Sequence, residues 1–342
     1  MMKYLVTLGC IMTLLSGCSV YQLTGDTMVD YSSEHMIPYL LERDDTAAVC
    51  ATGLGLGQFL VSFGRVTDPP HKSQTVIQLS ASTCAEQDAW RAELDYLRAL
   101  RRGDASGAVD ASIAQKRAHT VTAKRLHLAY QGAVSAFGEP GEQCPELENE
   151  FDEMVWLLGM LAVVQGLQHD RAAEGAAGIP LDMPARAARG VACLDNQRWW
   201  GVPQALKAAV WSSVPGLAPE KSDPWAELAA AVKVGDEAGV RLSRAIQLKA
   251  LTSGGRAQEA RAALKQYRAL DATFKRAPRW KGFDQIGRLQ MLHMSDVIWV
   301  KETGHRTPFK GLGTFPEAEE EESNGAESDE GGLFDDLDDA GE

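Results

Sequence analysis

Cysteine is the residue type in this sequence with the widest choice of chemistry. Four cysteines lie in the long central part of the chain, at Cys50, Cys84, Cys144 and Cys193. Four thiolates could hold a tetrahedral zinc ion, but no two of these cysteines have the C-x-x-C spacing that is typical of zinc sites. Disulfide bonds are the better interpretation. Among the three pairings that four cysteines allow, proximity along the chain favours Cys50 with Cys84 and Cys144 with Cys193.

A further cysteine, Cys18, stands at the end of an export signal. A short positive start, residues 1–3, precedes an apolar run over residues 4–15, and small residues then lead directly to Cys18. This order is typical of a secretory signal peptide, and the apolar run is too short to span a bilayer. Leu15-Ser16-Gly17-Cys18 resembles the lipobox of bacterial lipoproteins. The resemblance implies cleavage before Cys18 and acylation of that cysteine, and the alternative is an ordinary signal peptide with a chance cysteine.

The residue after Cys18 bears on the destination of the chain. Ser19 occupies the position at which lipoproteins retained in the inner membrane carry aspartate. By the sorting rule known for such lipoproteins, we expect an outer-membrane anchor and a body that faces the periplasm. Export also places the four central cysteines in an oxidising compartment, which favours disulfide bonds over free thiols.

Charge divides the chain into a neutral body and an acidic tail. The net charge is −13, from 34 basic and 47 acidic residues, but residues 317–342 hold 13 acidic residues and no basic one. The remainder is neutral overall and carries no basic cluster, so nucleic acid is not an expected partner. We expect a signal peptide at 1–17, a tether at 18–31, a helical body at 32–315 and an acidic disordered tail at 316–342.

The motifs that would indicate catalysis are missing from the sequence. His119 and His127 share one face of a predicted helix, but no carboxylate stands between them at a ligand spacing, and HExxH does not occur. The glycines at Gly53, Gly55 and Gly57 have helical flanks, whereas a dinucleotide-binding loop follows a strand. Gly53 and Gly57 are four residues apart and share one helix face, so we interpret them as helix-packing residues. We therefore expect no catalytic residue, no metal and no cofactor.

The most unusual cluster combines arginine with two adjacent tryptophans, at Arg198, Trp199 and Trp200. Neighbouring residues on a helix point to different faces, so we expect that the two rings cannot both lie in the core. Aromatic residues together with arginine are frequent at binding surfaces, although large residues between helices more often form core. The sequence thus offers these three residues as a partner-binding site.

Periodic apolar residues predict an all-α chain of about eleven or twelve helices. Asp45, Asp104 and Asp223 are placed to act as N-caps, and Pro224 suits a first helical position. Ser32 or Ser33 could cap an earlier helix, and the long apolar segment at 154–167 indicates the most buried helix. The helices are expected near 32–43, 45–63, 73–84, 86–102, 105–137, 145–170, 185–194, 199–214, 224–235, 237–251, 256–275 and 284–302.

An internal echo suggests that the helices repeat. The segment around Gly103-Asp104 resembles that around Gly235-Asp236, and each is expected at a turn between two helices. The stretch 225–270 looks like a tetratricopeptide-type unit. Because the period is irregular, the expected architecture is a degenerate tetratricopeptide-like α-solenoid.

These features together resemble the T component that is associated with tripartite ATP-independent periplasmic (TRAP) transporters. The resemblance runs over about residues 28–300 and rests on the lipobox, the helical repeats, Leu194-Asp195 ahead of Trp200-Gly201, and the unit at 225–250. It implies a tetratricopeptide-like lipoprotein that associates with a periplasmic solute-binding protein, and it further implies a homotrimer. The alternatives from other classes are an envelope hydrolase and a general envelope scaffold.

The lipid anchor can be tested at one atom. Cys18→Ser removes the thiol to which a lipid would be attached, so radiolabelled palmitate should no longer be incorporated. Most of the variant should move from the washed membrane fraction to the soluble fraction. Palmitate labelling and membrane sedimentation equal to those of the wild type would contradict the assignment.

Overall fold

The computed structural model describes residues 20–214 and 216–316, which form helices and turns without any β-strand among them. This confirms the all-α prediction for that part of the chain. The proposed signal peptide, Cys18 and residues 317–342 lie outside the described residues. In chain order the elements are α2 (Val20–Tyr31), η2 (Ser32–Met36), α3 (Ile37–Leu41), α4 (Thr46–Leu54), α5 (Leu56–Ser62), η3 (Phe63–Arg65), α6 (His71–Arg101), α7 (Ala105–Phe137), α8 (Glu150–Ala172), α9 (Met183–Gly190), η4 (Val191–Cys193), α10 (Val202–Ser213), α11 (Pro224–Ala238), α12 (Leu242–Ser253), α13 (Ala257–Asp271), η5 (Pro278–Trp280) and α14 (Lys281–Thr303).

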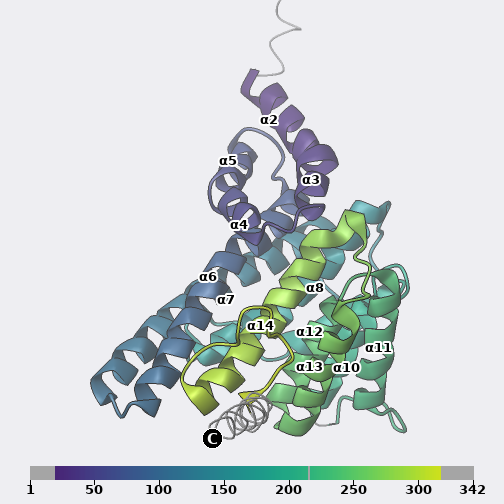
Figure 1. Ribbon diagram of the computed structural model, residues 1–342. Coiled ribbons are helices and arrows are strands. Elements are labelled where there is room, and N and C mark those ends of the chain that lie inside the picture. The colour runs from purple at the N-terminus through teal and green to yellow at the C-terminus, as the bar shows by residue number, and fades with distance from the viewer. Residues whose placement is uncertain (1–19, 215, 317–342) are drawn as a thin grey trace, which may run out of the picture.

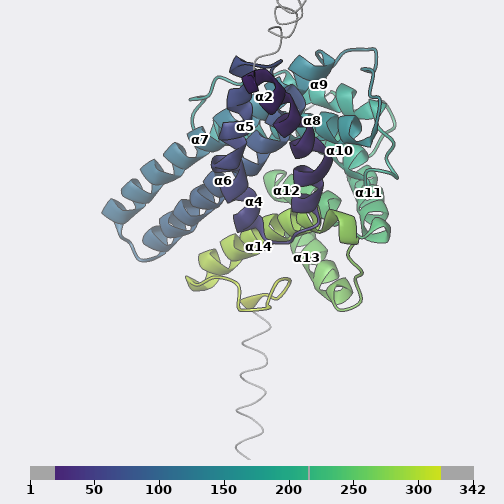
Figure 2. The same cartoon turned by 90° about the horizontal axis from the view of Figure 1, so that it is seen from above.

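Three parts can be followed in Figure 1. The short helices α2–α5 form a lobe at one end, the long antiparallel pair α6 and α7 runs from this lobe to the opposite end, and α10–α13 pack side by side next to α8. Helix α14 crosses between the long pair and the α10–α13 group. Both views show the loop end of the α6–α7 hairpin at the edge of the molecule (Figures 1 and 2), where Arg101 of α6 donates to the carbonyl of Lys301 in α14 at 3.1 Å.

Helix α8 is the centre of the main core, as the apolar run at 154–167 predicted. Every residue from Met154 to Leu167 is buried except Gln165. The indole of Trp156 donates a hydrogen bond of 2.9 Å to the carbonyl of Gly190, which satisfies its polar group inside the core. A helix that is apolar on all sides is stable only when other elements cover it on all sides, and here α7, α9 and η4 pack against it.

Both expected disulfide bonds are present, with the pairing that sequence proximity favoured. Cys50 of α4 is bonded to Cys84 of α6, and Cys144 is bonded to Cys193 of η4, with Cα–Cα distances of 5.7 Å and 5.5 Å. The first bond holds the N-terminal lobe on the long hairpin. The second holds the extended segment before α8 against η4.

The prediction of two helices at 73–84 and 86–102 is wrong, because α6 is continuous from His71 to Arg101. No proline or glycine lies between the two expected segments, and Ala85 in the middle is buried. The apolar pattern differs between the two halves of α6 because each half packs against different elements. Its first half packs on the N-terminal lobe, and its second half lies next to α14.

The predicted helix end at Gly235 is also wrong. Helix α11 continues to Ala238 and ends at Gly239, whose φ of 78° is left-handed. A Cβ on Gly235 would lie 2.3 Å from the hydroxyl of Ser243, so glycine here permits close packing and does not stop the helix. The two similar segments therefore differ in structure: Gly103-Asp104 lies in the turn between α6 and α7, whereas Gly235-Asp236 lies inside α11.

At the N-terminus the expected tether is helical from Val20 onwards, in α2. Ser32 and Ser33 do not cap a helix, because both hydroxyls donate to the carbonyl of Val29 within a continuous helical stretch. The predicted caps at Asp45, Asp104 and Asp223 are confirmed, since each carboxylate accepts a hydrogen bond from a backbone N–H of the first turn.

Close contact between α6 and α7 gives the first structural prediction. A Cβ on Gly132 would lie 2.8 Å from the carbonyl oxygen of His71 and 3.0 Å from the backbone nitrogen of Thr75. Leucine favours helix, so Gly132→Leu should destabilise the protein only through this clash, by about 2–3 kcal/mol in urea unfolding. Ser135→Leu, at an exposed position on the same helix, is the matched control. Equal unfolding midpoints for the two variants would disprove the close contact.

Candidate functional site

The structure places both tryptophans of the predicted binding cluster in the core. Trp199 is 0% exposed and Trp200 is 3% exposed. The expectation that both rings could not be buried is wrong because the residues lie in a turn before α10, where Trp200 has a left-handed φ of 53°. The two rings pack edge to face at 5.4 Å, and Trp200 also contacts the rings of Trp280 and Phe283.

Arg198 remains at the surface, but it is already paired. Its guanidinium lies 2.8 Å from one oxygen of Glu153, and the other oxygen of Glu153 accepts the indole N–H of Trp199 at 2.7 Å. This arrangement fixes the turn on α8. The cluster therefore stabilises the fold, and its tryptophans are not accessible to a partner.

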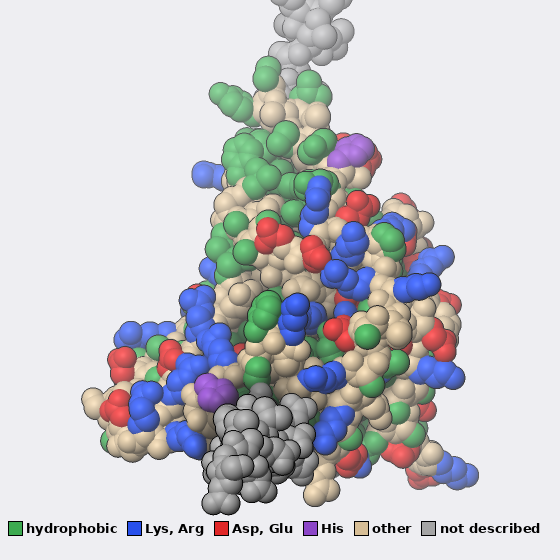
Figure 3. All heavy atoms as spheres, viewed as in Figure 1, with side chains coloured by type: hydrophobic (Ala, Val, Ile, Leu, Met, Phe, Trp, Pro, Cys, Tyr) green, Lys and Arg blue, Asp and Glu red, His purple; other side chains and the backbone are tan. Residues whose placement is uncertain are grey.

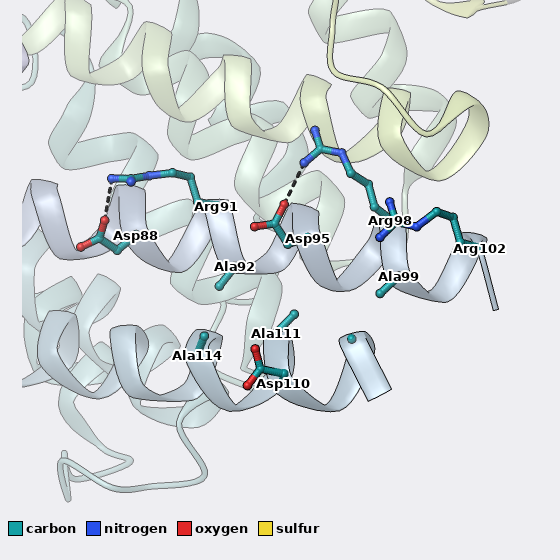
Figure 4. Close-up of a pocket in the computed structure, with 11 residues that line it drawn as sticks. Asp88, Arg91, Ala92, Asp95, Arg98, Ala99, Arg102, Asp110, Ala111 and Ala114 are labelled. Atoms are coloured by element: carbon teal, nitrogen blue, oxygen red, sulfur yellow. Dashed lines mark hydrogen bonds and ion pairs between the residues drawn. The ribbon is translucent and has the colours of Figure 1, made fainter. Parts of the chain in front are cut away.

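A different feature is accessible: a groove between α6 and α7 near the loop end of the hairpin (Figure 4). Its volume is about 470 Å³. Ala92 and Ala99 of α6 point toward Ala111 and Ala114 of α7, and these short side chains line the groove between the two helices. We call this feature the hairpin groove. Its lining residues are Asp88, Arg91, Ala92, Asp95, Arg98, Ala99, Arg102, Gly107, Asp110, Ala111 and Ala114.

The rim of the hairpin groove carries three arginines and three aspartates. Asp88 and Arg91 are 2.6 Å apart, and Asp95 and Arg98 are 2.9 Å apart. Arg98 also donates to the carbonyl of Gly304 at 3.3 Å, which ties the hairpin to the segment after α14. No such pairing is seen for Arg102 and Asp110 in the part of the chain that the structure describes. The groove can therefore offer one charge of each sign to a partner.

A second polar cluster lies between α6, α7 and α8. Nδ1 of His119 is 2.8 Å from Nδ1 of His169, whose Nε2 is 3.3 Å from Glu86. Nearby, His293 of α14 lies 2.9 Å from Glu93 and stacks on Trp90 with ring centroids 4.6 Å apart.

Burial and neighbouring charges shift the pKa values of His119 and Glu93. Desolvation, together with the neighbouring charge of His169, lowers the pKa of His119 to about 4. The hydrogen bond and charge of His293 lower the pKa of Glu93 although its burial acts in the opposite direction. His119 is thus neutral at pH 7 and can both donate and accept hydrogen bonds between the helices.

The cluster resembles a proton relay in its types of residue, yet its arrangement favours a structural role. Within residues 20–214 and 216–316 no group of three or more His, Cys, Asp or Glu side chains is arranged to hold a metal ion. His119 is buried and His169 is partly buried between helices, and the hairpin groove includes neither. The sequence carries no signal for Glu86, Glu93, His169 and His293, because the two glutamates lie on α6 while their histidine partners come from α8 and α14, far away in the chain.

One segment of the N-terminal lobe has an unusual composition. By length and composition alone, Thr46–Arg65 could cross a membrane, and 22% of its most apolar stretch is buried. In the structure this segment is divided at Gly55 into α4 and α5, and Cys50 fixes α4 to α6.

Comparison with known proteins adds no relative. No family model, no curated protein and no solved structure matches this chain.

The low pKa of His119 predicts an acid-sensitive fold. As the pH falls below the ordinary histidine value of 6.5, the unfolded chain takes up a proton that the folded chain does not accept until about pH 4. Stability contributed by neutral His119 is therefore lost as the pH falls. Between pH 7 and pH 5 the free energy of unfolding should decrease by about 2 kcal/mol through this residue.

Urea unfolding of His119→Gln measures that contribution, because glutamine does not titrate and still offers a hydrogen bond to His169. The variant should lose less stability than the wild type between pH 7 and pH 5. His35→Gln is the control, since the side chain of His35 is 64% exposed. An unchanged pH dependence in His119→Gln would refute the assignment.

Proposed function

We propose that this chain is a lipid-tethered helical protein of the bacterial envelope that binds a partner protein through the hairpin groove and catalyses no reaction. The observation that carries the proposal is the open groove near the loop end of α6 and α7. Lipobox-like residues ending at Cys18 support the tether. Resemblance to the T component of TRAP transporters supports a periplasmic solute-binding protein as the partner and a homotrimer as the assembly.

The surroundings of the hairpin groove suit a protein better than a small molecule. Small-molecule sites are enclosed and mostly apolar, with few polar groups. Here the rim residues Asp88, Arg91 and Asp95 are exposed, and the charges of the rim cancel. Protein interfaces combine such a polar rim with apolar contact area.

Exposed apolar side chains lie near the loop end of the same hairpin. Leu100 at the end of α6 is 53% exposed, and Val109 and Ile113 of α7 are 62% and 44% exposed. Leu100 and Val109 flank the turn at Gly103-Asp104. A partner that binds at the groove and also encloses the loop end of the hairpin would remove these side chains from water, which stabilises a complex.

The arrangement of α10–α13 supports a repeat architecture as part of the proposal. Helices α10, α11 and α12 pack against one another, and α13 packs on α12. Consecutive helices joined by short turns, with small residues at their contacts, are typical of α-solenoid repeats. Such proteins commonly present extended surfaces to other proteins.

A hydrolase would need a nucleophile beside a base, or two carboxylates with divided roles. The residues that line the hairpin groove are aspartate, arginine, alanine and glycine. Asp88 and Asp95 each accept a hydrogen bond from an arginine one turn away, so each carboxylate already has a partner within α6. The binding function requires none of these chemical groups to react.

Charge reversal on the rim tests the proposal. Arg102→Glu combined with Asp110→Lys keeps the net charge but exchanges the two signs that a partner would meet. Affinity purification of the detergent-solubilised double variant from its own cells should recover about tenfold less of the partner, which corresponds to about 1.4 kcal/mol. Mass spectrometry should identify that partner as a solute-binding protein.

Lys233→Glu is the matched control, because this exposed residue lies on α11, away from the groove. Both proteins should unfold at the wild-type temperature, since the changed side chains are exposed. Partner recovery that is equal in the double variant and the control would exclude the groove. Purification of the chain alone, together with hydrolysis of envelope material, would replace the proposal by the hydrolase.

A further inference from the structure

The N-terminal lobe carries an unusual concentration of exposed apolar side chains. Of the 17 large apolar residues that are exposed in the described chain, nine lie between residues 20 and 66. Figure 3 shows hydrophobic side chains gathered over the end of the molecule where Figure 1 places α2, α4 and α5. We call this surface the apolar cap; it consists of Val20, Tyr21, Leu23, Tyr31, Tyr39, Leu54, Leu56, Phe59 and Val66.

Close packing contacts hold the apolar cap in a fixed position on the rest of the molecule. Gly25 lets α2 approach η3 closely, since a Cβ there would lie 2.4 Å from the side chain of Thr67. The hydroxyls of Ser32 and Ser73 are 3.2 Å apart in a buried contact that joins the lobe to α6. On the other side, a Cβ on Gly53 would lie 2.5 Å from the backbone nitrogen of Ala81. These contacts, with the Cys50 disulfide, hold the lobe in place while its outer side stays open.

The sequence of the lobe explains why its outer side is apolar. Residues 46–64 contain no charged side chain. One face of α4 and α5 packs on α6 through Gly53 and Gly57, as expected for helix-packing glycines, and the opposite face exposes Leu54, Leu56 and Phe59. Monomeric soluble proteins rarely expose a contiguous apolar surface of this kind without a binding role.

We propose that the apolar cap rests in the interfacial region of a lipid bilayer. The inference relies on the proposed lipid anchor for its position, because Val20 stands two residues after Cys18 and is 78% exposed at the start of α2. An acyl chain at Cys18 would bring this end of the lobe to the membrane surface. Three tyrosines of the cap, Tyr21, Tyr31 and Tyr39, are of the type that accumulates at membrane–water interfaces.

The charge of the lobe defines the kind of contact. Residues 20–66 contain six acidic residues and two basic ones, Arg43 and Arg65, with no lysine. Anionic lipids would repel rather than attract such a lobe, so the contact depends on apolar burial. Binding should therefore be insensitive to salt and should not require anionic lipid.

The experiment places a fluorescent side chain in the cap of the full acylated chain. Phe59→Trp puts an indole at a position that is 52% exposed, and Val109→Trp puts one at the distant hairpin, 62% exposed. Each variant is incorporated into phosphatidylcholine vesicles whose acyl chains carry bromine. The emission added by Phe59→Trp over the wild type should fall about twofold, because bromine quenches only indoles that enter the bilayer. The emission added by Val109→Trp should not change.

Each outcome decides the proposal. Equal quenching of the two variants, or no quenching of either, overturns it. A change in the emission of Phe59→Trp that depends on protein concentration and not on the brominated lipid also overturns the proposal. It would assign the apolar cap to a contact with a second copy of the chain. Quenching of Phe59→Trp in a chain that mass spectrometry finds without an acyl group on Cys18 supports the cap and removes only the proposed anchor. If affinity purification recovers no partner protein, the result of the quenching experiment on the apolar cap is unaffected.

Discussion

Close packing of α6 against α7 is the constraint on which the other elements depend. The buried residues of α6 include Ala81, Ala85, Ala89 and Ala99, and Gly132 on α7 lies within contact distance of the backbone of α6. Small side chains let two long helices approach closely over many turns, and this contact gives a straight, rigid support. The lobe is attached to one end of this support, α8 packs against α7, and α14 lies beside the second half of α6. Small residues also line the hairpin groove, which lies on the surface between the same two helices.

A buried ionic network holds the other half of the molecule. Arg241 is 3% exposed; it donates to both carboxylate oxygens of Asp284 at 2.8 Å and stacks on the rings of Tyr267 and Phe274. Its contacts join the start of α12 to α13 and α14. Breaking such a pair would leave a buried charge without a partner, which is strongly unfavourable. We infer that the network fixes the angle at which α14 crosses from the α10–α13 group to α6.

Local signals in the sequence predicted local features correctly. Helix α7 has the predicted bounds because a capping aspartate and a terminal glycine define its two ends. The disulfide pairing followed from proximity along the chain. Residues whose role depends on distant neighbours were not predictable in this way. Glycine is a residue type that often ends a helix, but Gly235 lies inside α11, where the lack of a Cβ allows Ser243 to approach closely. A regular helix would direct Trp199 and Trp200 to different faces, whereas the turn before α10, with its left-handed backbone at Trp200, lets both rings pack in the core.

The length of α6 has a consequence for where the molecule would work. The lobe contacts α6 near Ala81, and the hairpin groove extends to Arg102 at its other end. At about 1.5 Å per helical residue, roughly 30 Å of uninterrupted helix separates these two points. Helix α6 would then set the distance between the bilayer and the far end of the groove. A protein held on lipid at the apolar cap would present its groove beyond the headgroup layer, at a fixed height where proteins that diffuse in the periplasm can reach it.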